Sequence, residues 1–199
     1  PLATHLMLAL QATDSYNFRT MSRSDHHVTD ASILPLWMKL TEELAGVFDT
    51  QFVCAAIACE VAAFSGCTTV VGVSGQQREY YDVWICRPDR TSTQVRWREE
   101  EASFAVIINS DKAVRLEKLS QSVTGLINSE MWLLAQDGIL AVPLPFPTDE
   151  SQPAKSGVLS LIDPPENNKL GEVELENLAR GLTVYLDRAT LRRQGTSRP

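Results

Sequence analysis

Apolar residues at helical spacing predict two helices early in the chain. From position 33, apolar residues recur in steps of three and four, with Lys39, Glu42 and Glu43 between them. This pattern is typical of an amphipathic helix. Its apolar positions are Ile33, Leu36, Leu40, Leu44 and Val47. Residues 50–64 are rich in alanine and nearly all apolar, which predicts a second helix that is covered on most sides and that ends at Gly66.

Segments rich in β-branched and aromatic residues predict strands. Residues 68–74, 80–87 and 93–98 are separated by short turn-forming segments, so we expect three strands joined by hairpin-length loops. Residues 104–111 fit either a strand or a loop. A further amphipathic helix is predicted from the apolar positions Leu116, Leu119, Val123, Leu126 and Ile127.

The last third of the chain is predicted to contain further strands and a final helix. Residues 131–135, 139–146 and 157–162 predict three strands, and a polar loop separates the last two. A closing helix is predicted from the apolar repeat Leu175, Leu178, Leu182, Tyr185 and Ala189. Two helices, three strands, a helix, two or three strands and a final helix indicate an α+β fold around an antiparallel sheet.

Alternation along the strands divides the sheet into two different faces. One face is large and apolar and is expected to pack under helices; it comprises Val71, Val73, Tyr81, Val83, Ile85, Leu140, Val142, Leu144, Leu159 and Leu161. The other is smaller and more polar; it comprises Val70, Gly72, Ser74, Asp82, Trp84, Cys86, Ala141, Pro143, Val158, Ser160 and Ile162. Such a mixed face suits a small-molecule cavity. Alternatively, Trp84 fills the space as core.

Residues 33–193 resemble a GAF domain, the PAS-like sensory module of phosphodiesterases, phytochromes and bacterial signalling proteins. The resemblance rests on the strand pair 139–144 and 157–161 with a polar loop between them, the long Leu/Ala helix that follows, and the segment 118–129 with Gly125 inside it. It implies a six-stranded antiparallel sheet, with the terminal helices on one face and a pocket on the other. Residues 1–32 are then an N-terminal arm, and 194–199 are a tail.

A candidate ligand pocket is expected on the mixed face. Asp82, Trp84 and Cys86 alternate on one strand, and aromatic walls and hydroxyl groups are available nearby. The candidate ligand-binding residues are Ser74, Asp82, Trp84, Cys86, Trp97, Phe104, Trp132 and Ser160. No Arg or Lys lies on the proposed face of the central strands, so a planar or heterocyclic ligand fits better than a phosphorylated one.

Catalytic chemistry is not indicated for this chain. Its histidines, His5, His26 and His27, all lie outside the presumed domain, and no glycine-rich phosphate loop is present. The run 99–101 of three glutamates is interpreted as a solvated face. We therefore expect a non-enzyme, whose parent protein is a histidine kinase, a cyclase or another signalling enzyme.

The residues present in the sequence can also be compared with those that the cofactors known in GAF domains require. Haem is disfavoured because residues 33–193 contain no histidine, and covalent bilin is disfavoured because no cysteine precedes a histidine. The cyclic-nucleotide signature of the family does not align in its usual order, so that ligand stays open without support. Cys54, Cys59, Cys67 and Cys86 lack the spacing of a zinc site and are interpreted as free thiols of a reducing cytoplasm. The ligand is unidentified.

Composition and net charge limit the classes of partner that this chain is expected to bind. The 199 residues, 44% hydrophobic and 22% charged, are typical of a folded chain. The net charge of −7 disfavours nucleic acid and anionic lipid as partners. No run of 18 apolar residues exists, and the chain starts at Pro1, so we expect a soluble fragment of a longer protein. The free thiols lead us to expect that it is cytoplasmic.

Two functional interpretations remain open. In the first, the chain is the ligand-sensing GAF domain of a bacterial signal-transduction protein, such as a two-component sensor, and relays binding to an output domain through its terminal helices. In the second, it is a ligand-free structural or dimerisation module. A homodimer through the terminal helices is expected in either case, because Val184, Leu186 and Leu191 lie off the main apolar stripe of the last helix.

Overall fold

The structure is a computed structural model that describes residues 33–47, 49–74, 79–99, 104–110, 112–117, 130–146 and 156–195. All of them belong to one compact unit, Ser32–Pro199. The predicted arm, 1–32, and the helical segment 118–129 lie outside the described residues.

The two early helices form as predicted. Helix α2, Leu34–Leu44, buries Leu36, Leu40 and Leu44, the centre of the predicted stripe. Helix α3, Thr50–Ser65, begins at Asp49, whose carboxylate accepts a hydrogen bond from the Gln51 N–H at 2.7 Å. It ends at Gly66, whose φ of 71° lies in the left-handed region that favours glycine.

Six strands form one fully antiparallel sheet, which confirms the predicted fold class. The strands are β1 Thr68–Ser74, β2 Tyr80–Cys86, β3 Ser92–Arg98, β4 Val114–Glu117, β5 Gly138–Pro145 and β6 Ser156–Ile162. Their order across the sheet is β3-β2-β1-β6-β5-β4. The two central strands are therefore β1 and β6, the first and last strands along the chain.

Three short segments differ from the prediction. Helix α5, Ala105–Ile108, stands where a strand or loop was expected, and helix α6, Glu130–Leu134, replaces the expected strand 131–135. Leu116, expected in a helix, lies in strand β4. In α6, Met131 and Trp132 are both buried while Leu133 and Leu134 face outwards, a pattern that a strand would not give. Runs of four or five apolar residues do not distinguish helix from strand.

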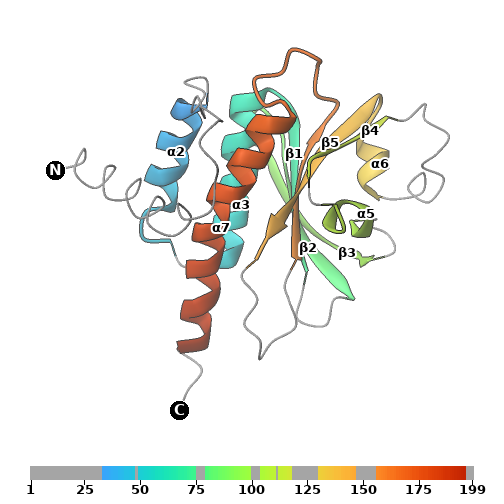
Figure 1. The fold of residues 1–199 in the computed structure, drawn as a ribbon. Coiled ribbons are helices and arrows are strands. Elements are labelled where there is room, and N and C mark those ends of the chain that lie inside the picture. The colour runs from blue at the N-terminus through green and yellow to red at the C-terminus, as the bar shows by residue number, and fades with distance from the viewer. Residues whose placement is uncertain are drawn as a thin grey trace, which may run out of the picture. The chain divides into compact units, whose positions relative to one another are not determined.

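Helices cover both faces of the sheet (Figure 1). Helices α2, α3 and α7, Glu172–Gly195, lie on one side, and α5 and α6 lie on the other. The helix-side core includes the predicted Val71, Val73, Leu140, Val142, Leu144, Leu159 and Leu161. Leu186, expected on a second surface of the last helix, is fully buried in this core, whereas Val184 is exposed.

Helices α2 and α7 pack against each other and run in the same direction. The Trp37 ring lies on Gly181, where an added Cβ would be 2.2 Å from the ring atom Cη2. One turn further along both helices, the Thr41 and Tyr185 hydroxyl oxygens are 3.2 Å apart and share a hydrogen bond. The terminal helices thus form one packed pair.

Strand β2 has the opposite phase to the one predicted. The register pairs Val71 with Trp84 and Gly72 with Val83, and paired residues of an antiparallel ladder share a face. Asp82, Trp84 and Cys86 therefore lie on the side of α3, whereas Tyr81, Val83 and Ile85 lie on the side of α5 and α6. Alternation gives the two faces within one strand, but only the register relates the faces of neighbouring strands.

Candidate functional site

The sheet face under α5 and α6, called here the α5/α6 face, is the candidate site. Its floor comes from the four central strands and its cover from the two short helices. The buried floor residues include Val70, Tyr81, Val83, Ala141, Val158, Ser160 and Ile162. The cover is made by Phe104 before α5, Ile107 in α5, and Met131 and Trp132 in α6.

Phe104 lies over Gly72 in the centre of the sheet. An added Cβ at Gly72 would come 2.2 Å from ring atom Cε2, so the missing side chain is what lets the ring approach the backbone. Tyr81 meets Phe104 edge to face, with ring centroids 4.9 Å apart and planes at 88°. Trp97 stands 6.0 Å from Phe104 at 49°. The three rings form an aromatic cluster on one half of the face.

The residue that follows β6 fixes the segment that connects α6 to β5. Asp163, with a φ of 49°, directs its carboxylate at three consecutive backbone N–H groups. It accepts hydrogen bonds from Gln136 at 2.8 Å, Asp137 at 2.7 Å and Gly138 at 2.9 Å. These bonds fix where the chain leaves α6, and so help to position Trp132 over the sheet.

Two of the predicted site residues on this face, Ser74 and Ser160, differ in their hydrogen bonding. The Ser74 hydroxyl oxygen accepts a hydrogen bond from the Ser156 N–H at 2.9 Å, which joins the ends of β1 and β6. Ser160 is fully buried between Val70 and Ala141 in the register, and its Oγ has no hydrogen-bond partner among the described residues. A buried polar atom without a partner is costly and is an unusual feature of a native core.

Five of the eight predicted site residues belong to the α5/α6 face: Ser74, Trp97, Phe104, Trp132 and Ser160. The other three do not. Asp82 pairs with Arg96 at 2.8 Å, Trp84 is buried in the helix-side core, and Cys86 contacts Cys59 of α3. The prediction that Asp82, Trp84 and Cys86 share a face with Trp97 is therefore wrong, because the phase of β2 was reversed.

Sequence reasoning missed Tyr81, Ile107 and Met131 as parts of this face. Tyr81 was placed under the helices by the reversed phase of β2. Gly72 was a usable signal, since a glycine inside a β-branched strand indicates that another group approaches the backbone closely.

In the part of the chain that the structure describes, no group of three or more His, Cys, Asp or Glu side chains could hold a metal ion. Within the same residues, no helix is long and apolar enough to cross a membrane.

Comparison with known proteins identifies the fold. No protein-family model matches the chain, and no curated protein matches its sequence. Among solved structures, it is similar to the GAF domain of an Acinetobacter phosphoenolpyruvate-protein phosphotransferase, with a TM-score of 0.52 and 14% identity over 82% of this chain and 96% of that one. The corresponding GAF domain from Coxiella burnetii gives a TM-score of 0.51 and 10% identity over 83% and 97%.

The chain therefore has a GAF-like fold. It is also similar to the free methionine-R-sulfoxide reductase of Neisseria meningitidis, solved in complex with its substrate, with a TM-score of 0.53 and 14% identity over 87% of this chain and 97% of that one. This fold is generally that of a regulatory domain, but an enzyme also uses it. The fold alone does not decide between the two roles.

Proposed function

We propose that this chain is a ligand-sensing GAF domain of a larger bacterial signal-transduction protein, and that the ligand binds at the α5/α6 face. The observation that carries this proposal is the Ser160 hydroxyl, which is buried on the α5/α6 face without a partner among the described residues. A ligand atom that hydrogen-bonds to this oxygen would remove the cost of its burial.

The chemistry of the face favours a planar or heterocyclic ligand with a polar edge. The rings of Trp97 and Phe104 provide surfaces for stacking, and Ser160 provides one hydrogen bond for orientation. Phe104 occupies the centre of the face, so binding requires its ring to leave Gly72. Because α5 has only four residues, the movement of Phe104 involves a small element rather than the whole core.

Signalling in this proposal passes through the sheet to the terminal helices. Strand β6 directs Ser160 towards the ligand side and its neighbours Leu159 and Leu161 into the helix-side core. That core also contains the packed helices α2 and α7, which would carry the change to an output domain in the parent chain. The chain itself would be a non-enzyme, homodimeric and cytoplasmic, and its output would be a kinase, a cyclase or another signalling activity.

The test is a thermal-shift screen of the full chain against planar heterocycles, followed by titration calorimetry of any compound that raises the melting temperature. Ser160→Ala should weaken the binding of such a compound about 5-fold to 30-fold, as expected for one lost hydrogen bond to a buried group. Ser92→Ala makes the same change at an exposed position on β3 and should leave binding unchanged.

A second function, the ligand-free structural module, is favoured by the Phe104 ring over Gly72, which already fills the centre of the face. If no compound raises the melting temperature and Phe104→Ala opens no binding either, the sensing proposal fails. The structural module then accounts for the fold.

A further inference from the structure

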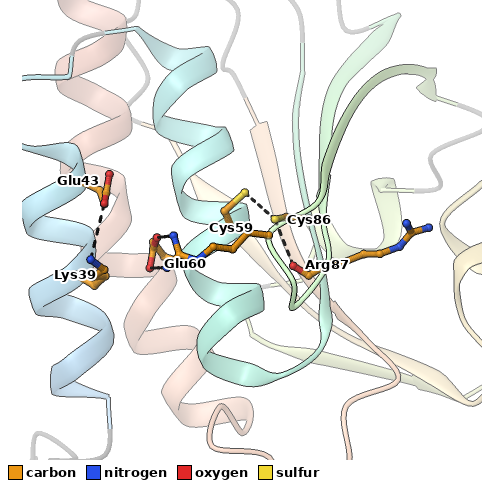
Figure 2. Close-up of polar contacts among 7 residues, drawn as sticks. Lys39, Glu43, Cys59, Glu60, Cys86 and Arg87 are labelled. Atoms are coloured by element: carbon orange, nitrogen blue, oxygen red, sulfur yellow. Dashed lines mark hydrogen bonds and ion pairs between the residues drawn. The ribbon is translucent and has the colours of Figure 1, made fainter.

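Two cysteines from different layers of the fold meet at the junction of α3 and β2 (Figure 2). The Cys86 thiol, at the end of β2, donates to the Cys59 sulfur of α3 over 2.7 Å. This distance is shorter than the roughly 3.5–4.0 Å at which two carbon atoms make their best contact, although sulfur is larger than carbon. A disulfide bond is about 2.05 Å long. The two sulfur atoms are thus close enough to bond after a small displacement.

The backbone on both sides of this contact is held in place. Cys86 is paired across the sheet with Thr69 on one side and Ser92 on the other. Next to Cys59 on α3, Glu60 is almost fully buried. Its carboxylate forms an ion pair with Arg90 at 2.8 Å and accepts a hydrogen bond from the same guanidinium at 3.0 Å. This bidentate pair joins the hairpin after β2 to α3, so it helps to keep the two cysteines together.

The two thiols differ in their access to solvent. Cys86 is fully buried, whereas Cys59 is partly exposed. Burial, followed by the Cys59 contact, raises the pKa of Cys86 to about 12, so Cys86 stays protonated at neutral pH. Cys59 is therefore the thiol that a small oxidant reaches first. Cys67 is held elsewhere, by a hydrogen bond from the Asn168 side-chain amide at 3.0 Å.

We propose that Cys59 and Cys86 are an oxidation-sensitive pair that forms a reversible disulfide when the protein meets hydrogen peroxide. In the first step, the Cys59 thiol is oxidised to a sulfenic acid and peroxide is reduced to one molecule of water. In the second, the Cys86 sulfur bonds to the Cys59 sulfur, the S–O bond breaks, and the Cys86 proton leaves with the hydroxyl group as a second water. A dithiol reductant returns the pair to two thiols.

The bond would join the helix layer to the sheet at one point. It closes a covalent loop from residue 59 to residue 86, and such a cross-link stabilises a fold mainly by restricting the unfolded chain. Oxidation should therefore raise the melting temperature, and reduction should reverse the rise. This device acts on the side of the sheet opposite to the α5/α6 face and does not depend on the proposed ligand.

The experiment uses the full wild-type chain, reduced, desalted and treated with stoichiometric hydrogen peroxide. Remaining thiols are blocked with N-ethylmaleimide, and peptides are mapped by mass spectrometry without reduction. Titratable thiols should fall from the four of the sequence to about two. A linked peptide containing Cys59 and Cys86 should appear, and it should disappear after treatment with dithiothreitol.

Single variants locate the bond. Cys59→Ser and Cys86→Ser should lose the linked peptide, and in Cys86→Ser the sulfenic acid at Cys59 should be trapped by dimedone. Cys67→Ser is the matched control and should form the disulfide like the wild type. A wild-type protein that keeps all four thiols after peroxide, or that links other cysteines at the same rate, overturns the proposal. The thiol count and the peptide map of the wild type decide the question, and they do not require any variant to fold.

Discussion

Ser160 and Leu161 are adjacent, both are fully buried, and they point to opposite sides of the sheet. Ser160→Ala removes a hydroxyl that has no partner among the described residues, so the free energy of unfolding should stay the same or rise slightly. Leu161→Asp places a carboxylate in the helix-side core at a cost of several kcal/mol, comparable to the stability of a whole domain. Circular dichroism melts should show a native-like Ser160→Ala and an unfolded Leu161→Asp. Equal melting temperatures would contradict the assignment of the faces.

Gly72 sets the distance between Phe104 and the sheet. Gly72→Ala should destabilise the fold by about 1–3 kcal/mol, because the new methyl group meets the ring and the core is overpacked. Phe104→Leu removes the ring atoms of that contact, so Gly72→Ala should cost much less in the Phe104→Leu background. Urea unfolding of the four proteins measures this coupling. Additive effects of the two substitutions would show that the ring does not lie on Gly72.

Cys86 makes stability depend on alkaline pH. Its pKa in the folded state, about 12, is higher than the value near 8.5 of an unfolded cysteine, so the folded state holds the proton more tightly. The resulting stabilisation is complete below about pH 8.5 and is lost progressively as the pH rises towards 12. Between pH 7 and pH 10, the reduced wild type should lose on the order of 1–2 kcal/mol more than Cys86→Ala. Urea unfolding with a phosphine reductant measures the difference. Parallel pH profiles would contradict the shift.

At the scale of secondary-structure elements, the packing of α2 on α7 depends on Gly181. In an exposed helix, Gly→Ala stabilises by about 1 kcal/mol. Here the new Cβ would be 2.2 Å from the Trp37 ring, and overpacking costs about 1–3 kcal/mol, so Gly181→Ala should destabilise the protein or leave it unchanged. In a Trp37→Ala background, the same substitution should stabilise it. Thermal melts of the four proteins check this change of sign, and stabilisation in both backgrounds would contradict the contact.

The same scale explains how far the sequence predicted the structure. The long elements were predictable because their apolar periodicity extends over many residues, as in α2 with Leu36, Leu40 and Leu44. The short α6 was not, because five residues do not distinguish the two periods. The candidate site was predicted in part: Ser74 and Ser160 follow from strand parity, and the aromatic residues Trp97, Phe104 and Trp132 follow from residue type. Asp82, Trp84 and Cys86 required the register of β2 against β1.

At the scale of the whole molecule, two cores share one sheet. The helix-side core holds the terminal helices, and the core of the α5/α6 face holds the aromatic cluster. Strand β6 contributes alternate residues to both cores, so a displacement of Ser160 also displaces its neighbours Leu159 and Leu161. Interiors are close-packed, and such a displacement is passed on rather than absorbed. In the proposed sensing function, this link between the two cores would couple a ligand at the α5/α6 face to the terminal helices.

The coupling would need a partner surface on those helices, and exposed apolar residues are present there. Leu34 and Met38 lie one turn apart on α2, with 49% and 55% of their surface exposed, and Val184 of α7 is 43% exposed. Pairing two copies through these helices would bury the three side chains, so the full chain should sediment as a dimer at tens of micromolar. The double variant Met38→Glu/Val184→Glu should sediment as a monomer, because it places charges on that surface. Leu133→Glu is the matched control, since Leu133 is 73% exposed on α6, across the sheet from α2 and α7, and it should remain a dimer. A monomeric wild type, or a double variant that stays dimeric, would show that the terminal helices do not form the interface.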